Sequence, residues 1–289
     1  ICMAYLFGRE WTKKELLAHV GDIRQLGGVR RLELTEGRAA GMEVAEFRTG
    51  SGLNFHVTLS RALDITEAEY NGQALAWRSS TSDVAPSYYE PQGRGWLRSF
   101  SGGLVATCGL SNAGASGQDE GQELGMHGRI GNLPAENIYV DGAWEGDEYL
   151  MWAQGKIREA TVFGENLLLT RRVSAKLGES KIWIDDVVEN QGTGSSEFMF
   201  LYHINLGFPV VAEGAKLLTP KGTVVPRDED AREGREQYAS FPAPTRGYRE
   251  KVYYHDLVAE KQGHITVAIV NPNHDNGRGI GVYVKYKKE

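Results

Sequence analysis

Alternation of apolar and polar residues dominates the chain and predicts β-strands. In residues 279–288, GIGVYVKYKK, every second residue from Ile280 to Tyr286 is apolar, so one face of the predicted strand is apolar. Residues 166–192 predict a hairpin whose two arms are separated by the turn residues at 178–180.

Two further stretches continue this pattern. Residues 56–77, HVTLSRALDITEAEYNGQALAW, predict two strands with a break at Asn71 and Gly72, which are typical turn residues. Residues 264–270, HITVAIV, predict another strand.

One helix is predicted near the start of the chain. Thr12 and Glu15 form the T-x-x-E pattern of a capping box. Apolar residues then share one face at helical spacing until a glycine pair ends the pattern. These residues are Leu16, Leu17, Val20 and Ile23, and the glycines are Gly27 and Gly28.

The turn residues and the near absence of further helical periodicity indicate the fold class. The chain has 36 glycines, many of them in turn clusters between short alternating runs, which predicts an antiparallel all-β protein. Alternation does not distinguish a sandwich from a barrel, but the lack of a fixed repeat disfavours a propeller. No Pro- or Ser-rich linker divides the sequence, so residues 1–289 are predicted to form a single domain.

Charge and composition limit the partners. The 32 basic and 38 acidic residues give a net charge of -6 without a long run of either sign, whereas nucleic acids and anionic membranes attract clustered Lys and Arg. No apolar run reaches the roughly 18 residues of a membrane span. The two cysteines, Cys2 and Cys108, suggest no disulfide framework. We therefore predict a cytoplasmic protein without a nucleic-acid or membrane partner.

Two of the seven histidines lie in unusual surroundings. His127 lies in residues 124–135, LGMHGRIGNLPA, where glycines permit positive φ angles. This segment is either a loop that presents an imidazole or an ordinary surface turn. His203 lies in residues 197–210, EFMFLYHINLGFPV, on the same strand face as Leu201. It is either a core residue or the polar group of a pocket.

Other chemistries have less support. Glu123 and His127 are four residues apart, but the glycine between them argues against a helix and no HExxH motif occurs, so we predict no metal site and no cofactor. No GxSxG elbow occurs, and Cys108 has no histidine beside it in sequence. The glycines of RGWLRSFSGGL form no nucleotide-binding motif. What remains is a pocket of hydrogen-bonding groups with aromatic walls, which suits a sugar.

Five segments, in this order along the chain, carry a resemblance to a known family. They are SRALDI at 60–65, TCGLSNAG at 107–114, ELGMHGRIGNLPA at 123–135, LYHINLGFPV at 201–210 and VVPRDED at 224–230. Together they resemble the galactose mutarotase-like superfamily, also called the aldose 1-epimerases, and in particular a bacterial branch labelled only as a domain of unknown function. The resemblance implies a large antiparallel β-supersandwich with a sugar site in a cleft across one sheet.

The resemblance also implies site residues. The substrate-binding candidates are Arg61, Asp64, Arg129 and Asp228, and the catalytic candidates are His127 and His203. His127 matches the histidine that holds the substrate, and His203 matches the general acid on the ring oxygen. Asp64 and Arg129 either contact the substrate or form an ion pair that holds loops in place.

The activity that the resemblance implies is the interconversion of sugar anomers. A proton reaches the ring oxygen while a second group removes the proton of the anomeric hydroxyl, and an imidazole, with an ordinary pKa of about 6.5, suits the first step. In the family the second group is a glutamate after the final strands, so a segment beyond Glu289 is expected to supply it. The alternatives are a sugar-binding or regulatory protein without turnover, and a lyase or hydrolase. The partner is a small sugar or sugar acid of unspecified identity, and the oligomeric state is not predicted.

Overall fold

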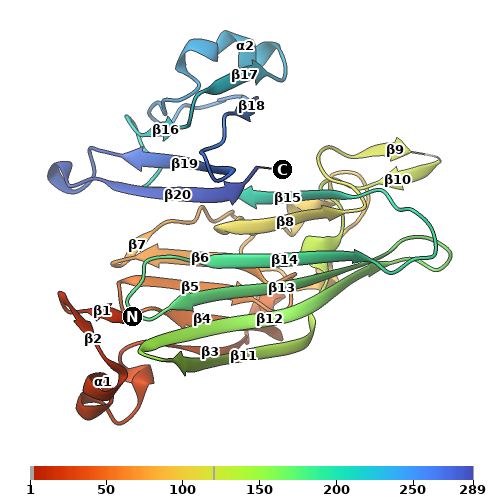
Figure 1. Ribbon diagram of the computed structural model, residues 1–289. Helices are drawn as coiled ribbons and strands as arrows, with labels where there is room; N and C mark the ends of the chain where they lie inside the picture. Colours follow the sequence, from red (N-terminus) through yellow and green to blue (C-terminus); the bar gives the residue numbers. More distant parts are fainter. Residues whose placement is uncertain (1–2, 120, 289) are drawn as a thin grey trace. The chain divides into compact units, whose positions relative to one another are not determined.

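Strands dominate the computed structural model, which describes residues 3–119 and 121–288 (Figure 1). The chain divides into two compact units, Ile1–Asn205 and Leu206–Glu289. The prediction of an antiparallel all-β protein is confirmed. That residues 1–289 form a single domain stays a prediction.

The first unit is built on two antiparallel sheets, one in front of the other in Figure 1. The larger sheet has the strand order β15-β8-β6-β5-β4-β3, with β7 paired to β6. Its strands are β3 (Gly28–Leu34), β4 (Met42–Arg48), β5 (Leu53–Thr58), β6 (Asp64–Tyr70), β7 (Gln73–Ala74), β8 (Val105–Leu110) and β15 (Met199–Ile204). The smaller sheet consists of β11 (Glu136–Glu145), β12 (Glu148–Ala160), β13 (Asn166–Lys176) and β14 (Trp183–Asn190) in that order.

Shorter elements complete both units. In the first unit they are the hairpins β1 (Ala4–Leu6) with β2 (Arg9–Trp11) and β9 (Gly117–Asp119) with β10 (Gln122–Leu124), and the helix α1 (Lys13–His19). In the second unit they are the sheet of β16 (Lys216–Leu218), β19 (His264–Asn271) and β20 (Ile280–Lys287), the pair β17 (Gly222–Pro226) and β18 (Tyr253–Leu257), and α2 (Glu229–Glu233). In the described part of the chain, the helices are too short and too polar to cross a membrane.

The two sheets of the first unit bury their facing sides against each other. Along β13, the alternate residues from Leu167 to Ala175 are almost fully buried, as period-2 geometry requires of a strand with one face in the core. On the larger sheet, Phe47 and Phe55 stack with ring centroids 4.5 Å apart. The core therefore lies between the two sheets. His203 is on the face of β15 that points away from this core.

Most of the strand predictions are confirmed. The arms of the hairpin predicted at 166–192 are β13 and β14, and the strand predicted at 264–270 is β19. β19 pairs antiparallel with β20, which is the strand predicted at 279–288.

The interpretation of residues 56–77 needs a correction. Its first predicted strand is in fact two, β5 and β6, separated by a chain reversal in which Ala62 and Leu63 have positive φ angles of 48° and 54°. The pattern does not reveal the reversal because its apolar residues are buried and continue the alternation. The turn predicted at Asn71 and Gly72 is present, but the strand after it, β7, has only two residues.

The predicted helix begins where expected and ends early. Thr12 and Glu15 form both hydrogen bonds of the capping box. However, α1 ends at His19 instead of at the glycine pair, and Ile23–Gln25 forms a separate 3-10 turn. The side chain of Asp22 caps this turn by accepting a hydrogen bond from the Arg24 N–H, so the apolar spacing belongs to two short elements.

Candidate active site

The structure brings His127 and His203 together. Their ring centroids are 5.4 Å apart and their planes cross at 87°. His203 lies on β15 at one end of the larger sheet, and His127 lies in the loop between β10 and β11. Both residues are half-buried. The two histidines that the resemblance assigns to catalysis therefore lie side by side, while their roles stay predictions.

Three aromatic residues lie beside the imidazoles and form what we call the aromatic platform: Trp77, Trp96 and Phe100. Trp96 is 4.6 Å from the His127 ring and stacks on Phe100 at 4.2 Å, and Phe100 is 5.3 Å from the His203 ring. Trp96 is only 4% exposed, whereas Trp77, 5.9 Å from Phe100, is 45% exposed. The platform thus combines a buried ring, Trp96, with an exposed ring, Trp77, and such an aromatic surface suits the apolar face of a sugar.

No sequence motif identifies the residues of the aromatic platform. The only available signal was the W-x-x-x-F spacing of Trp96 and Phe100, which places both rings on one side of the short 3-10 helix Gly95–Arg98 and the turn after it. Composition alone could not separate these rings from core aromatics.

Backbone pairing places His127. Its N–H donates to the carbonyl of Gly114 at 2.8 Å, and its carbonyl accepts from the N–H of Gly109 at 3.1 Å. His127 itself has a positive φ of 58°, a conformation that few non-glycine residues adopt and that is common at functional sites. The glycine-rich loop predicted from the sequence therefore presents this imidazole through its backbone conformation.

A buried carboxylate supports the strand that pairs with this loop. Glu159 on β12 accepts hydrogen bonds from the N–H groups of Leu110 at 2.9 Å and Ser111 at 3.0 Å, and from the Ser111 hydroxyl. Glu159 is almost fully buried, and a buried carboxylate is stable only when donors satisfy its oxygens. The smaller sheet thus holds the end of β8, against which the His127 loop pairs.

Gly125, Gly128 and Gly131 of this loop have no room for a side chain, and of the three Gly128 alone also has a positive φ. Gly128 has a φ of +71°, and a Cβ atom there would overlap the carbonyl oxygens of Gly109 and Asn112. We expect Gly128→Ala to lower the free energy of unfolding by about 2–4 kcal/mol, because left-handed backbone strain of about 1–2 kcal/mol adds to the clash. Gly121→Ala is the control, since its φ is +82° but no other described atom lies within 4 Å of the point that its Cβ would occupy. Urea unfolding measures both, and equal losses would contradict the steric argument.

Arg61 lies in the reversal before β6, and its side chain is buried. Nε donates to the carbonyl of Gly131 at 2.9 Å, and Nη1 donates to the carbonyls of Ser99 at 2.6 Å and Val84 at 3.5 Å. Burial lowers the pKa of this guanidinium. Among the described residues Nη2 has no hydrogen-bond partner. Substrate binding by Arg61 stays a prediction.

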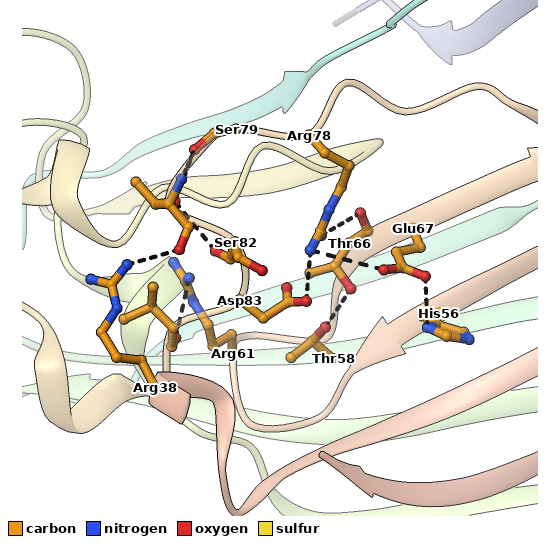
Figure 2. Close-up of polar contacts among 12 residues, drawn as sticks. Arg38, His56, Thr58, Arg61, Thr66, Glu67, Arg78, Ser79, Ser82 and Asp83 are labelled. Carbon is orange, nitrogen blue, oxygen red and sulfur yellow. Dashed lines mark hydrogen bonds and ion pairs between the residues drawn. The ribbon is translucent and has the colours of Figure 1, made fainter. Parts of the chain in front are cut away.

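Arg78, the residue after Trp77, makes polar contacts with β6 and with Asp83 (Figure 2). Arg78 donates from Nη2 to Asp83 at 2.6 Å and from Nη1 to the carbonyl of Thr66 at 2.9 Å. Glu67 lies 3.9 Å from the same guanidinium and 3.3 Å from the ring of His56. The contacts with Asp83 and Thr66 hold the guanidinium of Arg78, the residue that follows Trp77.

Asp64 belongs to a buried ion-pair network between the two sheets. Its Oδ1 accepts from the N–H of Thr107 at 2.9 Å and from the Thr107 hydroxyl at 2.6 Å, and lies 3.5 Å from Arg171 Nη1. Arg171 on β13 also makes two hydrogen bonds to Asp186, at 2.9 and 2.8 Å. Of the two roles considered for Asp64, substrate contact stays a prediction. In the described chain its ion pair is with Arg171 and not with Arg129.

Asp64 gives the network a pH dependence. Burial raises its pKa to about 6, although the Arg171 charge acts in the opposite direction. Since the unfolded value is about 3.9, the folded protein binds this proton more tightly, and the contribution of Asp64 to stability falls as the pH rises from about 4 to about 6. We expect wild type to lose about 1–3 kcal/mol relative to Asp64→Asn over this interval, measured by urea unfolding. A difference that does not change with pH would contradict the assignment.

The other two substrate-binding candidates lie in different surroundings. Arg129 is exposed, and its backbone N–H donates to the carbonyl of Gly109 at 3.1 Å. Asp228 belongs to the second unit, where it caps α2 by accepting from the N–H of Ala231 at 3.0 Å and pairs with Arg227 at 2.8 Å. The hydrogen bond from Ala231 and the Arg227 contact lower the pKa of Asp228. Sugar binding by either residue stays a prediction.

The described residues form neither a metal site nor a reactive thiol. Within residues 3–119 and 121–288, no cluster of three or more His, Cys, Asp or Glu side chains could hold a metal ion. Cys108 is fully buried, and burial raises the pKa of its thiol to about 12, so it is not a nucleophile at neutral pH. Cys2 lies outside the described residues.

Three solved structures have the same architecture and identify the fold. A Klebsiella pneumoniae protein, provisionally named an aldose 1-epimerase, aligns with a TM-score of 0.81 and 23% identity, covering 88% of this chain and 66% of its own. Galactose 1-epimerase from Lactobacillus acidophilus aligns with a TM-score of 0.50 and 11% identity, over 90% of this chain and 91% of its own. A galactose mutarotase-like protein from Clostridium acetobutylicum aligns with a TM-score of 0.52 and 10% identity, over 90% of this chain and 88% of its own. The fold is therefore the galactose mutarotase-like β-sandwich, as the resemblance implied.

The family follows from the sequence match. Residues 39–289 match the model of the family described as domain of unknown function (DUF4432), and the chain belongs to this family. A search of the curated proteins found no match. The chain spans 66% of the length of the Klebsiella protein.

Proposed function

We propose that the protein interconverts the anomers of a small sugar or sugar acid, with His203 as the general acid and His127 as a residue that holds the substrate. The observation that supports this most is the pair of imidazoles 5.4 Å apart, beside the stacked rings of Trp96 and Phe100. Imidazoles can move a proton at neutral pH at little cost, and aromatic rings offer an apolar surface to a pyranose.

The proposed reaction moves two protons, one to the ring oxygen and one from the anomeric hydroxyl. His203 donates a proton to the ring oxygen, the bond between that oxygen and C1 breaks, and a base takes the proton of the anomeric hydroxyl. The open-chain carbonyl compound rotates about its C1–C2 bond, and the ring closes on the other face as both protons return. The resemblance places the base, a carboxylate, after the final strands, so the assay uses the full-length protein.

The names of the similar structures support the same activity. Two of them are named as aldose 1-epimerase or galactose 1-epimerase, and the third as galactose mutarotase-like. At 23% identity or less these likenesses establish the fold alone, so the activity depends on the arrangement of His127 and His203.

Anomer exchange tests the proposal directly. Saturation-transfer NMR on a panel of aldoses and sugar acids measures exchange between α and β anomers, with buffer as the control. We expect at least one sugar to exchange faster in the presence of protein. Binding of a sugar without faster exchange would overturn the catalytic proposal in favour of a binding protein. Shortened or unsaturated products from an oligosaccharide would instead indicate a hydrolase or lyase.

A further inference from the structure

We propose that Asn205 is a positioning residue that commits His203 to proton transfer through Nε2, and that the two imidazoles are held in opposite tautomers. This inference rests on the proposed function for its chemical meaning, but the tautomers themselves follow from hydrogen bonds. Asn205 lies just after β15 and is buried, so its amide must find its partners within the protein.

The orientation of the Asn205 amide is determined by its neighbours. Nδ2 donates to the carbonyl of Gly103 and to the carbonyl of His203, both at 2.9 Å. The reversed amide would turn its oxygen toward these two carbonyl oxygens and leave them without a donor. Oδ1 therefore faces His203 Nδ1, at 2.6 Å.

This contact defines the protonation of the His203 ring. An amide oxygen only accepts hydrogen bonds, so Nδ1 must carry a proton. In the neutral ring Nε2 is then the unprotonated nitrogen, and in the imidazolium Nε2 carries the proton that can leave. The proton-transfer atom of His203 is therefore Nε2 in both directions of the reaction.

The His127 ring has the opposite arrangement. Its Nδ1 accepts a hydrogen bond from the backbone N–H of Gly114 at 3.2 Å. A ring nitrogen that accepts from an N–H carries no proton itself, so neutral His127 has its proton on Nε2 and can only donate there. Protonating Nδ1 would set two N–H groups against each other. In the neutral rings the two Nε2 atoms therefore differ: that of His127 is a hydrogen-bond donor and that of His203 an acceptor.

The backbone of Asn205 is fixed from both sides as well. Its N–H donates to the carbonyl of Leu104 at 3.2 Å, and its carbonyl accepts from the N–H of Trp77 at 2.9 Å. The residue that orients the His203 ring is therefore joined to the segment that carries the exposed ring of the aromatic platform. Substitution of the Asn205 side chain leaves these backbone bonds available.

Long-range ¹H–¹⁵N NMR of the imidazole rings tests the inference on the full-length protein, at an alkaline pH well above the ordinary imidazole pKa of about 6.5. We expect His203 to be protonated on Nδ1 and His127 on Nε2. In Asn205→Ala the His203 ring should lose its single tautomer. Asn205→Asp loses the two hydrogen bonds that Nδ2 donates but keeps the acceptor oxygen beside Nδ1, so it should retain the tautomer. A wild-type His203 protonated on Nε2 would overturn the inference.

Activity provides the second measurement. If the proposed function holds, Asn205→Ala should slow anomer exchange by about 10- to 100-fold, less than loss of the acid itself, and Asn205→Asp should restore part of the rate. Asn271→Ala is the matched control, because Asn271 is also buried and donates to a backbone carbonyl, that of Pro209 at 2.8 Å. Equal rate losses in Asn205→Ala and Asn271→Ala would overturn a positioning role. If wild type exchanges no sugar, the proposed function fails, while the NMR result still decides the tautomers.

Discussion

Full-length protein carrying His203→Ala is expected to lose about 100- to 10,000-fold of its anomer-exchange rate, the usual contribution of a general acid. His203 is half-buried beside Phe100. In the proposed reaction it exchanges its proton through Nε2, and alanine supplies neither donor nor acceptor. The fold should survive, since the side chain faces away from the core between the sheets. Saturation-transfer NMR gives the rate, and thermal unfolding by circular dichroism checks the fold.

Two further histidine variants sharpen this result. His127→Ala should weaken sugar binding more than it slows the bound reaction, because His127 is expected to hold the substrate. His56→Ala is the matched control: this imidazole lies on β5 between Glu46 and Glu67, and its loss should leave exchange unchanged. Wild-type rates in His203→Ala would remove His203 from the mechanism. A rate loss in His56→Ala as large as that in His203→Ala would show that the assay reports general damage.

Arg171→Met is expected to lower the free energy of unfolding by about 3–5 kcal/mol, the usual cost of removing one partner of a buried ion pair. Arg171 is fully buried, and the carboxylates of Asp64 and Asp186 beside it are nearly so. Burial disfavours the charge of Arg171, but the hydrogen bonds to Asp186 and the negative charges of Asp186 and Asp64 together outweigh this and raise its pKa. Methionine fills a similar volume but leaves both carboxylates without their cation, so urea unfolding at neutral pH should detect the loss.

The neighbouring arginine provides the control for this prediction. Arg172 lies on the opposite face of β13, with its guanidinium 4.6 Å from the ring centroid of Trp152, and Arg172→Met should cost about 1 kcal/mol or less. The loss in Arg171→Met should also shrink toward pH 5, because protonation of Asp64, whose pKa is about 6, removes one unpaired charge. Comparable losses in the two variants would contradict the network as a source of stability.

Arg171 also illustrates why part of the fold could not be predicted. In NLLLTRRVSAK the alternating pattern identifies a strand, and the buried parity includes Leu169 and Val173 as expected. The same parity places an arginine in the core, which hydrophobicity alone disfavours. Its partners, Asp64 and Asp186, come from other strands, so no local pattern announces them.

Some residues of the candidate site could likewise be found from the sequence, and others could not. His127 and His203 could be found because each lies in an unusual segment, and the resemblance joined them. Trp96 and Asn205 were missed, since neither belongs to a local motif with a known chemical meaning. Trp96 matters because its ring contacts His127, which is distant from it in sequence. Asn205 is only two residues from His203, but the sequence does not reveal that its side chain turns back to the His203 ring.

By itself the sequence determined the antiparallel all-β class, several of the longer strands and the start of α1, because these depend on residue periodicity, turn residues and capping within a few positions. Only the tertiary structure decided which polar groups meet: the pairing of the two imidazoles, the amide that orients one of them and the ion pairs between the sheets. The physical reason is that a hydrogen bond or an ion pair depends on distance in space, and strands distant in sequence supply its two partners.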